Sequence, residues 1–227
     1  MRTRTGSPVE IVEVFPARRR ERRLFAELPF RLARHWEAWQ PGVRRLHEDL
    51  IDPGRNPFWR RRRGSFFVAL AEGRVVGRLA LVDPGSLPER PHDAVLAFPD
   101  FADDDGVVGA LLEAVEARAL ERGARGLVGP LNPNIHHDVG ILVSGHERRN
   151  AVLMGYQPPY YQGHFEARGF ERLADFEAWA LWREAFQAQD RLLRLARRVE
   201  RHPALRIRPA DLGRFERELQ IFFRLYS

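Results

Sequence analysis

The stretch that decides the fold is Ala94–Gly129, which reads AVLAFPDFADDDGVVGALLEAVEARALERGARGLVG. It opens with the apolar run Ala94–Phe98 and closes with the short apolar run Gly126–Gly129, and both runs are typical of buried strands. Between them, apolar residues recur at helical spacing from Val108 to Ala119. Three aspartates precede this segment, and negative charge is favoured at the start of a helix. The stretch therefore predicts a strand, a crossing helix and a second strand.

Segments on both sides of this stretch add further strands and helices. Val9–Val14 alternates between apolar and polar residues, as a half-buried strand does, and the turn Glu72-Gly73 joins two apolar runs into a predicted hairpin. The order of the elements predicts a mixed α/β or α+β layer structure. The remaining predicted elements are helices over 18–38, 43–50 and 160–168, hairpin strands over 65–71 and 74–82, and a last strand over 176–182.

The composition excludes several classes of protein. The chain has 227 residues, 44% hydrophobic and 30% charged, and it contains no cysteine. It therefore has no disulfide framework, no thiol nucleophile and no cysteine-based zinc site, and we expect no metal site of another kind, because the adjacent His136 and His137 lack a ligand spacing. No apolar run reaches the roughly 18 residues that span a bilayer. We expect a cytoplasmic protein without membrane contact.

All 37 basic residues are arginine, and the formal net charge is +6. Two clusters stand out, Arg18–Arg23 and Arg60–Arg63. Such clusters can bind the phosphate groups of nucleic acids, but the same pattern is typical of a solvated helix face or a basic loop. No recognised nucleic-acid motif accompanies them. Nucleic-acid binding is therefore the least favoured function.

Two short motifs carry a resemblance to a known family. Gly106–Leu112 (GVVGALL) begins the long helix, and Phe165–Phe170 (FEARGF) follows a polar loop. With the order of the elements, these motifs resemble the GNAT superfamily of N-acetyltransferases over about residues 9–184. The resemblance implies a mixed central sheet with helices on both faces. It also implies transfer of an acyl group from acetyl-CoA, or another acyl-CoA, to the amine of a small molecule or a protein.

The resemblance also places a cofactor site. In GNAT proteins the diphosphate of coenzyme A rests on amide groups at the start of the long helix, in the pattern Arg/Gln-x-x-Gly-x-Gly/Ala. Here the pattern falls on Asp103-x-x-Gly106-x-Val108, so only the middle glycine matches. Consecutive carboxylates repel a diphosphate, which predicts an atypical or degenerate site. The residues to which the resemblance assigns cofactor contacts are Phe98, Gly106, Val107, Val108 and Gly109.

GNAT enzymes often use a tyrosine near the departing thiolate. That tyrosine lies in a Leu-Tyr-Glu-x-x-Gly-Phe stretch of the family, where this chain has Phe165. Tyr160 and Tyr161, one turn earlier, are the candidate replacements for the catalytic tyrosine. The alternative is that both aromatic side chains anchor the short helix to the sheet.

The reaction also needs a base for the amine. The polar loop 130–140 offers one, with His136 as the candidate and His137 or Asp138 as alternatives. The same polar residues are typical of a loop whose side chains pair with its own backbone.

Two short segments recur with an offset of 193 residues, Pro16 to Pro209 and Phe30 to Phe223. They are VFPA over 14–17, which returns as IRPA, and PFRL over 29–32, which returns as FFRL. Repetition at this length predicts the first strand and first helix of a second copy, as in tandem-GNAT proteins, which the chain resembles. The predicted organisation is a GNAT-like domain over 1–184, a connecting helix over 185–204 and an incomplete repeat over 205–227.

Two hypotheses about function follow. The first is an acyl-CoA-dependent N-acyltransferase with an atypical or degenerate cofactor site. The second is a non-catalytic GNAT-like module that provides structure or holds substrate beside a second GNAT-like half or in a homodimer.

Overall fold

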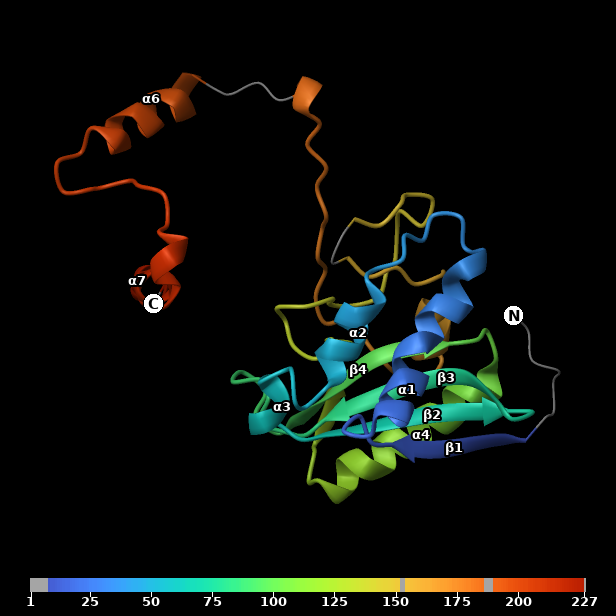
Figure 1. Ribbon diagram of the computed structural model, residues 1–227. Coiled ribbons are helices and arrows are strands. Elements are labelled where there is room, and N and C mark those ends of the chain that lie inside the picture. Colours follow the sequence, from blue (N-terminus) through green and yellow to red (C-terminus); the bar gives the residue numbers. More distant parts are fainter. Residues whose placement is uncertain (1–7, 152–153, 186–189, 227) are drawn as a thin grey trace. The chain divides into compact units, whose positions relative to one another are not determined.

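The computed structural model describes residues 8–151, 154–185 and 190–226 (Figure 1). The chain forms two compact units, Met1–Phe176 (unit 1) and Glu177–Ser227 (unit 2). Unit 1 contains a sheet with helices packed on it, whereas the described part of unit 2 contains helices and connecting segments only.

Unit 1 is built on a five-stranded sheet. In sequence order, which is also the spatial order, the strands are β1 (Val9–Val14), β2 (Gly64–Ala71), β3 (Arg74–Val82), β4 (Asp93–Phe101) and β5 (Gly126–Val128). The first four strands pair antiparallel, and β4 pairs parallel with β5. Helix α4 (Asp105–Glu121) connects β4 with β5, so the predicted strand, crossing helix and strand are confirmed.

Helices cover both faces of this sheet. On β2, Phe66 and Val68 belong to one packed layer and Phe67 and Ala69 to the other, as the alternation of side chains along a strand requires. The helices on the Phe66 side are α1 (Arg19–Leu32), α2 (Arg44–Ile51) and α3 (Phe58–Arg61), with the short 3-10 helix η1 (Ala33–His35) after α1. The other side carries α4 and α5 (Tyr160–Glu166). Figure 1 shows α1 and α2 opposite α4, which confirms a mixed sheet between two helical layers.

The predicted last strand over 176–182 is wrong. These residues have no regular secondary structure, and Trp179 is 87% exposed. An alternating pattern produces a strand only where a neighbouring strand supplies hydrogen bonds. Within the described residues, β5 pairs with β4 alone, so it is the edge strand.

Unit 2 contains the helices α6 (Asp190–Glu200) and α7 (Phe215–Tyr226), and the 3-10 turns η2 (Arg183–Ala185) and η3 (Leu212–Arg214). No residue of α6 or α7 is buried. Within the segment 205–227, which the sequence predicts to begin a second copy, residues 215–226 are helical as α7, whereas the strand predicted near 205–210 is absent and those residues have no regular structure. None of the described helices is long and apolar enough to cross a lipid bilayer.

Packing between β3 and α4 requires a residue without a side chain at Gly77. A Cβ atom there would lie 2.7 Å from Leu111 Cδ1 and 2.9 Å from Val107 Cγ1. We therefore expect Gly77→Ala to lower the free energy of unfolding by about 1–3 kcal/mol, because the added methyl group overpacks the core. Urea denaturation measures the change.

The control is Gly163→Ala on α5, where a Cβ atom would meet nothing within 4 Å. Alanine is the better helix former, so this variant should gain up to about 1 kcal/mol. Unchanged stability of Gly77→Ala would contradict the close approach of α4 to β3.

Candidate functional site

The sheet parts between β4 and β5. The two strands pair only from Asp93 to Val95 of β4, although β4 continues to Phe101. Beyond that point, the loop after β5 takes over the free edge of β4: the Leu131 amide donates to Leu96 O at 3.0 Å, and the Phe98 amide donates to Asn132 Oδ1 at 2.6 Å. Phe98 itself has a left-handed backbone conformation with φ of 54°. The Phe98 amide is therefore already paired.

The start of α4 is capped by the protein itself. Asp104 is the N-cap residue, and its Oδ1 accepts a hydrogen bond from the Val107 amide at 3.1 Å. Val108 is buried in the core, and its amide donates to Asp104 O. A Cβ atom on Gly106 would lie 3.3 Å from Asp104 Oδ1. The carboxylate of Asp104 thus occupies the position over this helix start where an anion is favoured.

An ion cluster joins the start of α4 to α5; its members are Asp103, Asp105, His164 and Arg168. His164 Nε2 lies 3.0 Å from Asp103 Oδ1. Arg168 donates to Asp105 Oδ1 at 2.6 Å and to Asp105 O at 2.7 Å. These hydrogen bonds from Arg168 lower the pKa of Asp105. A Cβ atom on Gly109 would lie 3.4 Å from Arg168 Nη2, so the guanidinium group covers the first turn of α4.

These residues do not fit a diphosphate. Three carboxylates surround the helix start, and the nitrogen groups that could bind phosphate, on His164 and Arg168, are already paired with two of them. The sequence motif does not reveal His164 and Arg168 as partners. Their spacing of four residues, with His164 on α5 and Arg168 in the turn just after it, is the signal that could have found them.

Tyr160 and Tyr161 lie where α5 meets the end of β4. Tyr160 donates to Phe101 O at 2.7 Å, and the Phe101 amide donates to the Tyr161 hydroxyl at 3.0 Å. The Tyr161 ring is fully buried and stacks on Phe101 with ring centroids 4.2 Å apart. Burial raises the pKa of both hydroxyl groups. Both tyrosines therefore hold α5 on β4 through one residue, Phe101.

A buried ion pair lies on the opposite face of β4. Arg78 is 4% exposed; its Nη2 lies 2.6 Å from Asp100 Oδ2, and its Nη1 donates to Phe25 O. Burial raises the pKa of Asp100, and Arg78 opposes that shift. Burial also lowers the pKa of His47 to about 4, with a further contribution from Arg78. Nothing in the sequence pattern singles out Arg78 or Asp100, because a charged residue in a strand normally faces solvent.

The loop residue Asp138 adds another carboxyl group near this end of β4. The backbone oxygen of Asp138 accepts a hydrogen bond from the Asn132 amide, and the Asn132 side chain accepts one from the Phe98 amide of β4. Asp138 is therefore connected to the free edge of β4 through Asn132. Burial and the negative charge of Asp100 raise the pKa of Asp138 to about 6. A base with a pKa close to the working pH is well suited to proton transfer.

The other two candidate bases are less enclosed. His136 is exposed, and the His137 ring lies 3.0 Å from Asn134 Oδ1. Burial lowers the pKa of His137. Within the described residues, no group of three or more His, Asp or Glu side chains is placed to hold a metal ion.

A cavity of about 590 Å³ lies beside β5. Its walls are β5 itself, the last turns of α4 and the segment from Arg168 to Leu173. The cavity therefore borders the C-terminal part of α4, and the start of α4, where the cofactor residues are predicted, is not among its walls.

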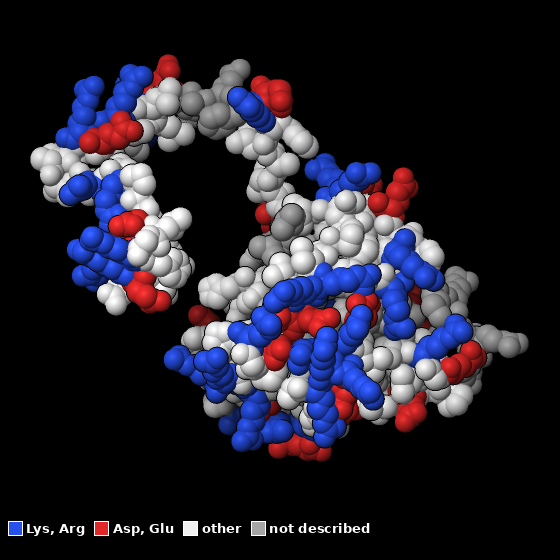
Figure 2. Space-filling view, in the orientation of Figure 1, with Lys and Arg blue, Asp and Glu red and all other residues white. Residues whose placement is uncertain are grey.

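The two arginine clusters differ in their pairing. In Arg18–Arg23, Arg18 pairs with Glu21 and Arg22 pairs with Asp52. Figure 2 shows acidic side chains between the arginines on this face of unit 1. In Arg60–Arg63 all four side chains are exposed, and none pairs with a carboxylate of the described residues.

The raised pKa of Asp138 makes the stability of the protein depend on pH. The folded protein keeps this carboxyl group protonated up to about pH 6, whereas the unfolded chain loses the proton near its ordinary value of about 3.9. Stability from this group is therefore present below pH 4 and is lost as the pH rises through 6. We expect Asp138→Asn, which cannot ionise, to gain on the order of 1–3 kcal/mol of unfolding free energy over the wild type between pH 4 and pH 7.

Denaturant titrations of both proteins at several pH values in this range measure that gain. A difference between the two proteins that stays constant from pH 4 to pH 7 would show that Asp138 titrates normally.

Two curated proteins are similar to the chain in sequence. A bacterial ceramide synthase of Caulobacter vibrioides is 29% identical over 205 residues, which are 88% of this chain and 52% of that protein. Protein YghO of Escherichia coli is 29% identical over 163 residues, which are 71% of this chain and 41% of that protein. The chain spans about half the length of the curated relatives that it matches. No family model matches it.

Several solved acetyltransferases are similar to the chain in structure. A ribosomal-protein-alanine N-acetyltransferase of Brucella melitensis is 16% identical, with a TM-score of 0.43, and the match covers 77% of this chain and 98% of that one. An acetyltransferase of Clostridium acetobutylicum, named a predicted acetyltransferase and solved with acetyl-CoA, is 8% identical, with a TM-score of 0.48 and coverage of 76% and 96%.

Proposed function

We propose that this chain is a GNAT-type domain of a longer N-acyltransferase that transfers an acyl group from acyl-CoA to an amine. The observation that carries the proposal is the parting of β4 from β5 after Val95, where Asn132 pairs with β4 and its amide donates to the backbone oxygen of Asp138. A relative at 29% identity is named a ceramide synthase, and a ceramide is the amide of a fatty acid with a sphingoid amine. The proposal therefore names a long-chain amine as the acceptor and a fatty acyl-CoA as the donor.

Asp138 is the residue that meets the amine in this proposal. A primary amine is protonated at neutral pH, and a carboxylate with a pKa of about 6 is ionised there, so the two attract each other. Asp138 accepts one proton from the ammonium group, which frees the nitrogen lone pair to attack the thioester carbonyl. The C–S bond breaks as the C–N bond forms, and the second proton lost by the nitrogen goes to the departing coenzyme A thiolate. Burial raises the pKa of Asp138, and the charge of Asp100 adds to that shift. Arg78 holds Asp100 in place on β4 through their buried ion pair.

The sequence-predicted residues take different roles in this proposal. Tyr160 and Tyr161 anchor α5 to β4, because both hydroxyl groups already bond to Phe101. His136 is the alternative base. The predicted cofactor residues at the start of α4, from Gly106 to Gly109, form a degenerate site, and the diphosphate of the donor binds in another part of the longer protein.

The second GNAT-like repeat remains part of the proposal. At the offset of 193, helix α7 covers the residues that correspond to all but the first turn of α1, and the matched segments are 52% and 41% of the curated relatives. Residues 185–204 connect the two copies, and 205–227 begin the second.

The second candidate function is a non-catalytic module that holds the acceptor or supports the rest of the protein. The ion cluster of Asp103, Asp105, His164 and Arg168 favours it, because a chain that fills its own diphosphate position has lost the usual way to bind coenzyme A. Binding of coenzyme A to the chain and to charge variants of the cluster tests whether the carboxylates are what keeps the diphosphate out.

We expect the wild-type chain to bind acetyl-CoA and palmitoyl-CoA more weakly than about 1 mM by titration calorimetry, since carboxylates repel the diphosphate. The double variant Asp103→Asn/Asp105→Asn removes two negative charges and frees Arg168, so its affinity should rise on the order of tenfold or more. The fold should persist, because Tyr160 and Tyr161 still hold α5.

The matched control is Glu113→Gln/Glu147→Gln, which removes the same charge away from the cluster and should leave the affinity unchanged. Micromolar binding by the wild type would contradict a degenerate site. No gain in affinity by Asp103→Asn/Asp105→Asn would show that repulsion by these two carboxylates does not explain the degenerate site.

The acceptor site makes a separate prediction. We expect the wild-type chain to bind a long-chain amine such as sphinganine above pH 6, and Asp138→Asn to bind it about tenfold more weakly, because one charge-assisted contact is lost. Tryptophan fluorescence or calorimetry measures the affinity. The neutral N-acetylated analogue is the control ligand, and its affinity should be equal for both proteins.

The variant His136→Ala tests the alternative base. If His136→Ala loses amine binding while Asp138→Asn keeps it, the acceptor site lies at His136 and the assignment to Asp138 is contradicted.

A further inference from the structure

Helix α6 separates apolar and basic residues on two faces. With about 100° between successive helical residues, its apolar side chains fall within an arc of about 160° and its arginines lie opposite. The apolar side chains Leu192, Leu193, Leu195 and Val199 are between 37% and 58% exposed. The basic side chains of the other face are Arg191, Arg194, Arg197 and Arg198, and Arg201 follows one residue after the helix. Figure 2 shows arginine side chains along α6.

The arginines of α6 have no acidic partner in the part of the chain that the structure describes. The acidic residues of the helix, Asp190 and Glu200, lie at its two ends and form no ion pair with them. A shallow hollow of about 510 Å³ runs along this face, and it is lined by Arg194, Arg197, Arg198, Arg201, His202 and Pro203. The face is therefore a cationic surface that lacks a counter-charge.

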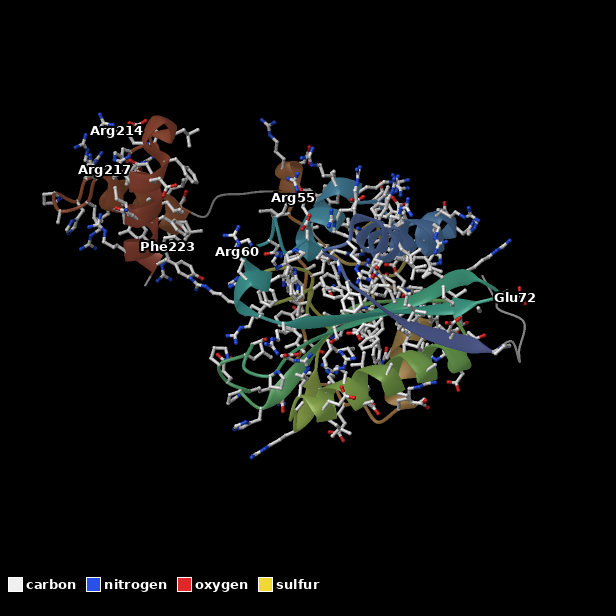
Figure 3. All side chains as sticks on the ribbon, turned by 60° about the horizontal axis from the view of Figure 1, so that its bottom comes forward. Arg55, Arg60, Glu72, Arg214, Arg217 and Phe223 are labelled. Carbon is white, nitrogen blue, oxygen red and sulfur yellow. The ribbon has the colours of Figure 1, made fainter. Side chains whose placement is uncertain are left out.

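Helix α7 provides a contrast within the same unit. Its polar residues balance, with Glu216 and Glu218 against Arg217 and Arg224, and Glu218 pairs with Arg208 at 2.9 Å. Figure 3 labels Arg217 and Phe223 on this helix. The sequence of α7 repeats part of α1, a helix that packs on a protein sheet. We therefore expect α7 to pack on a protein surface. Helix α6 does not correspond to a helix of unit 1 at the offset of 193, and its excess positive charge favours an anionic partner.

The length of α6 points the same way. It has 11 residues, and an isolated helix shorter than about 12–15 residues is marginal in water. A surface that takes up the apolar face and neutralises the arginines stabilises such a helix. An anionic lipid bilayer supplies both, because leucine and valine enter the acyl boundary while arginine side chains extend to the phosphate groups.

We propose that α6 lies in the plane of an anionic lipid bilayer, with Leu192, Leu193, Leu195 and Val199 in the interface and the arginines on lipid phosphates. The sequence-based expectation of no membrane contact rests on the lack of a spanning segment, and a helix that lies in the interface does not need one. The proposal is independent of acyl transfer.

Sedimentation of the full chain with lipid vesicles tests the proposal. We expect binding to vesicles of phosphatidylcholine with phosphatidylglycerol, little binding to phosphatidylcholine alone, and weaker binding at high salt. The variant Arg194→Gln/Arg197→Gln/Arg198→Gln should lower the partition coefficient about a hundredfold. The variant Leu192→Gln/Val199→Gln keeps the charge and should also lower it, because the apolar insertion is lost.

The control is Arg60→Gln/Arg61→Gln/Arg62→Gln, which removes the same charge from the other exposed cluster (Arg60 is labelled in Figure 3). It should leave vesicle binding unchanged. An equal loss of vesicle binding in this control would overturn the proposal, and so would a wild-type chain that does not bind anionic vesicles. A third contrary result is tight binding to a DNA duplex, together with vesicle binding that Leu192→Gln/Val199→Gln does not alter. The last result would assign the arginines to nucleic acid.

Discussion

Beyond Val95, β4 loses its neighbour β5, and the polar backbone groups along its free edge need other partners. Unpaired buried amide and carbonyl groups cost several times what a formed hydrogen bond contributes. Asn132 and Leu131 pair with one part of the edge, and the two tyrosines of α5 pair with Phe101 at its end. The loop and α5 are therefore fixed by the same strand. Every group of the candidate site, from Asp138 to the ion cluster, takes its position from those hydrogen bonds.

The strand, crossing helix and strand of unit 1 are predictable because their patterns are local. The apolar stripe of α4 and the aspartates before it lie within one continuous segment, and the helix begins at Asp105, as the charge pattern indicates. The segment 176–182 has an equally regular alternation, but its outcome depends on whether a partner strand is present, which no local pattern contains. The segment near 205–210 forms no strand, whereas its counterpart in the sequence overlaps β1, which has β2 as a partner strand.

The chemistry of the site is less accessible from the sequence. The three aspartates before α4 predict correctly that carboxylates surround this helix start, but their pairing with His164 and Arg168 brings together residues about 60 positions apart. Arg78 and Asp100 face each other because β3 and β4 pair in that register. Register depends on the whole sheet. The pKa of Asp138 is raised by burial in the folded loop and by the nearby charge of Asp100, so the sequence offers it as one of three candidate bases without a way to choose.

The basic surface in Figure 2 consists of guanidinium groups only, because arginine is the sole basic residue besides histidine. A guanidinium group stays protonated at physiological pH and is a poor nucleophile, whereas the ε-amino group of lysine attacks thioesters once it loses its proton. A surface whose positive charge comes from guanidinium groups therefore keeps that charge throughout the physiological pH range, and it offers no amino group to electrophiles that modify lysine.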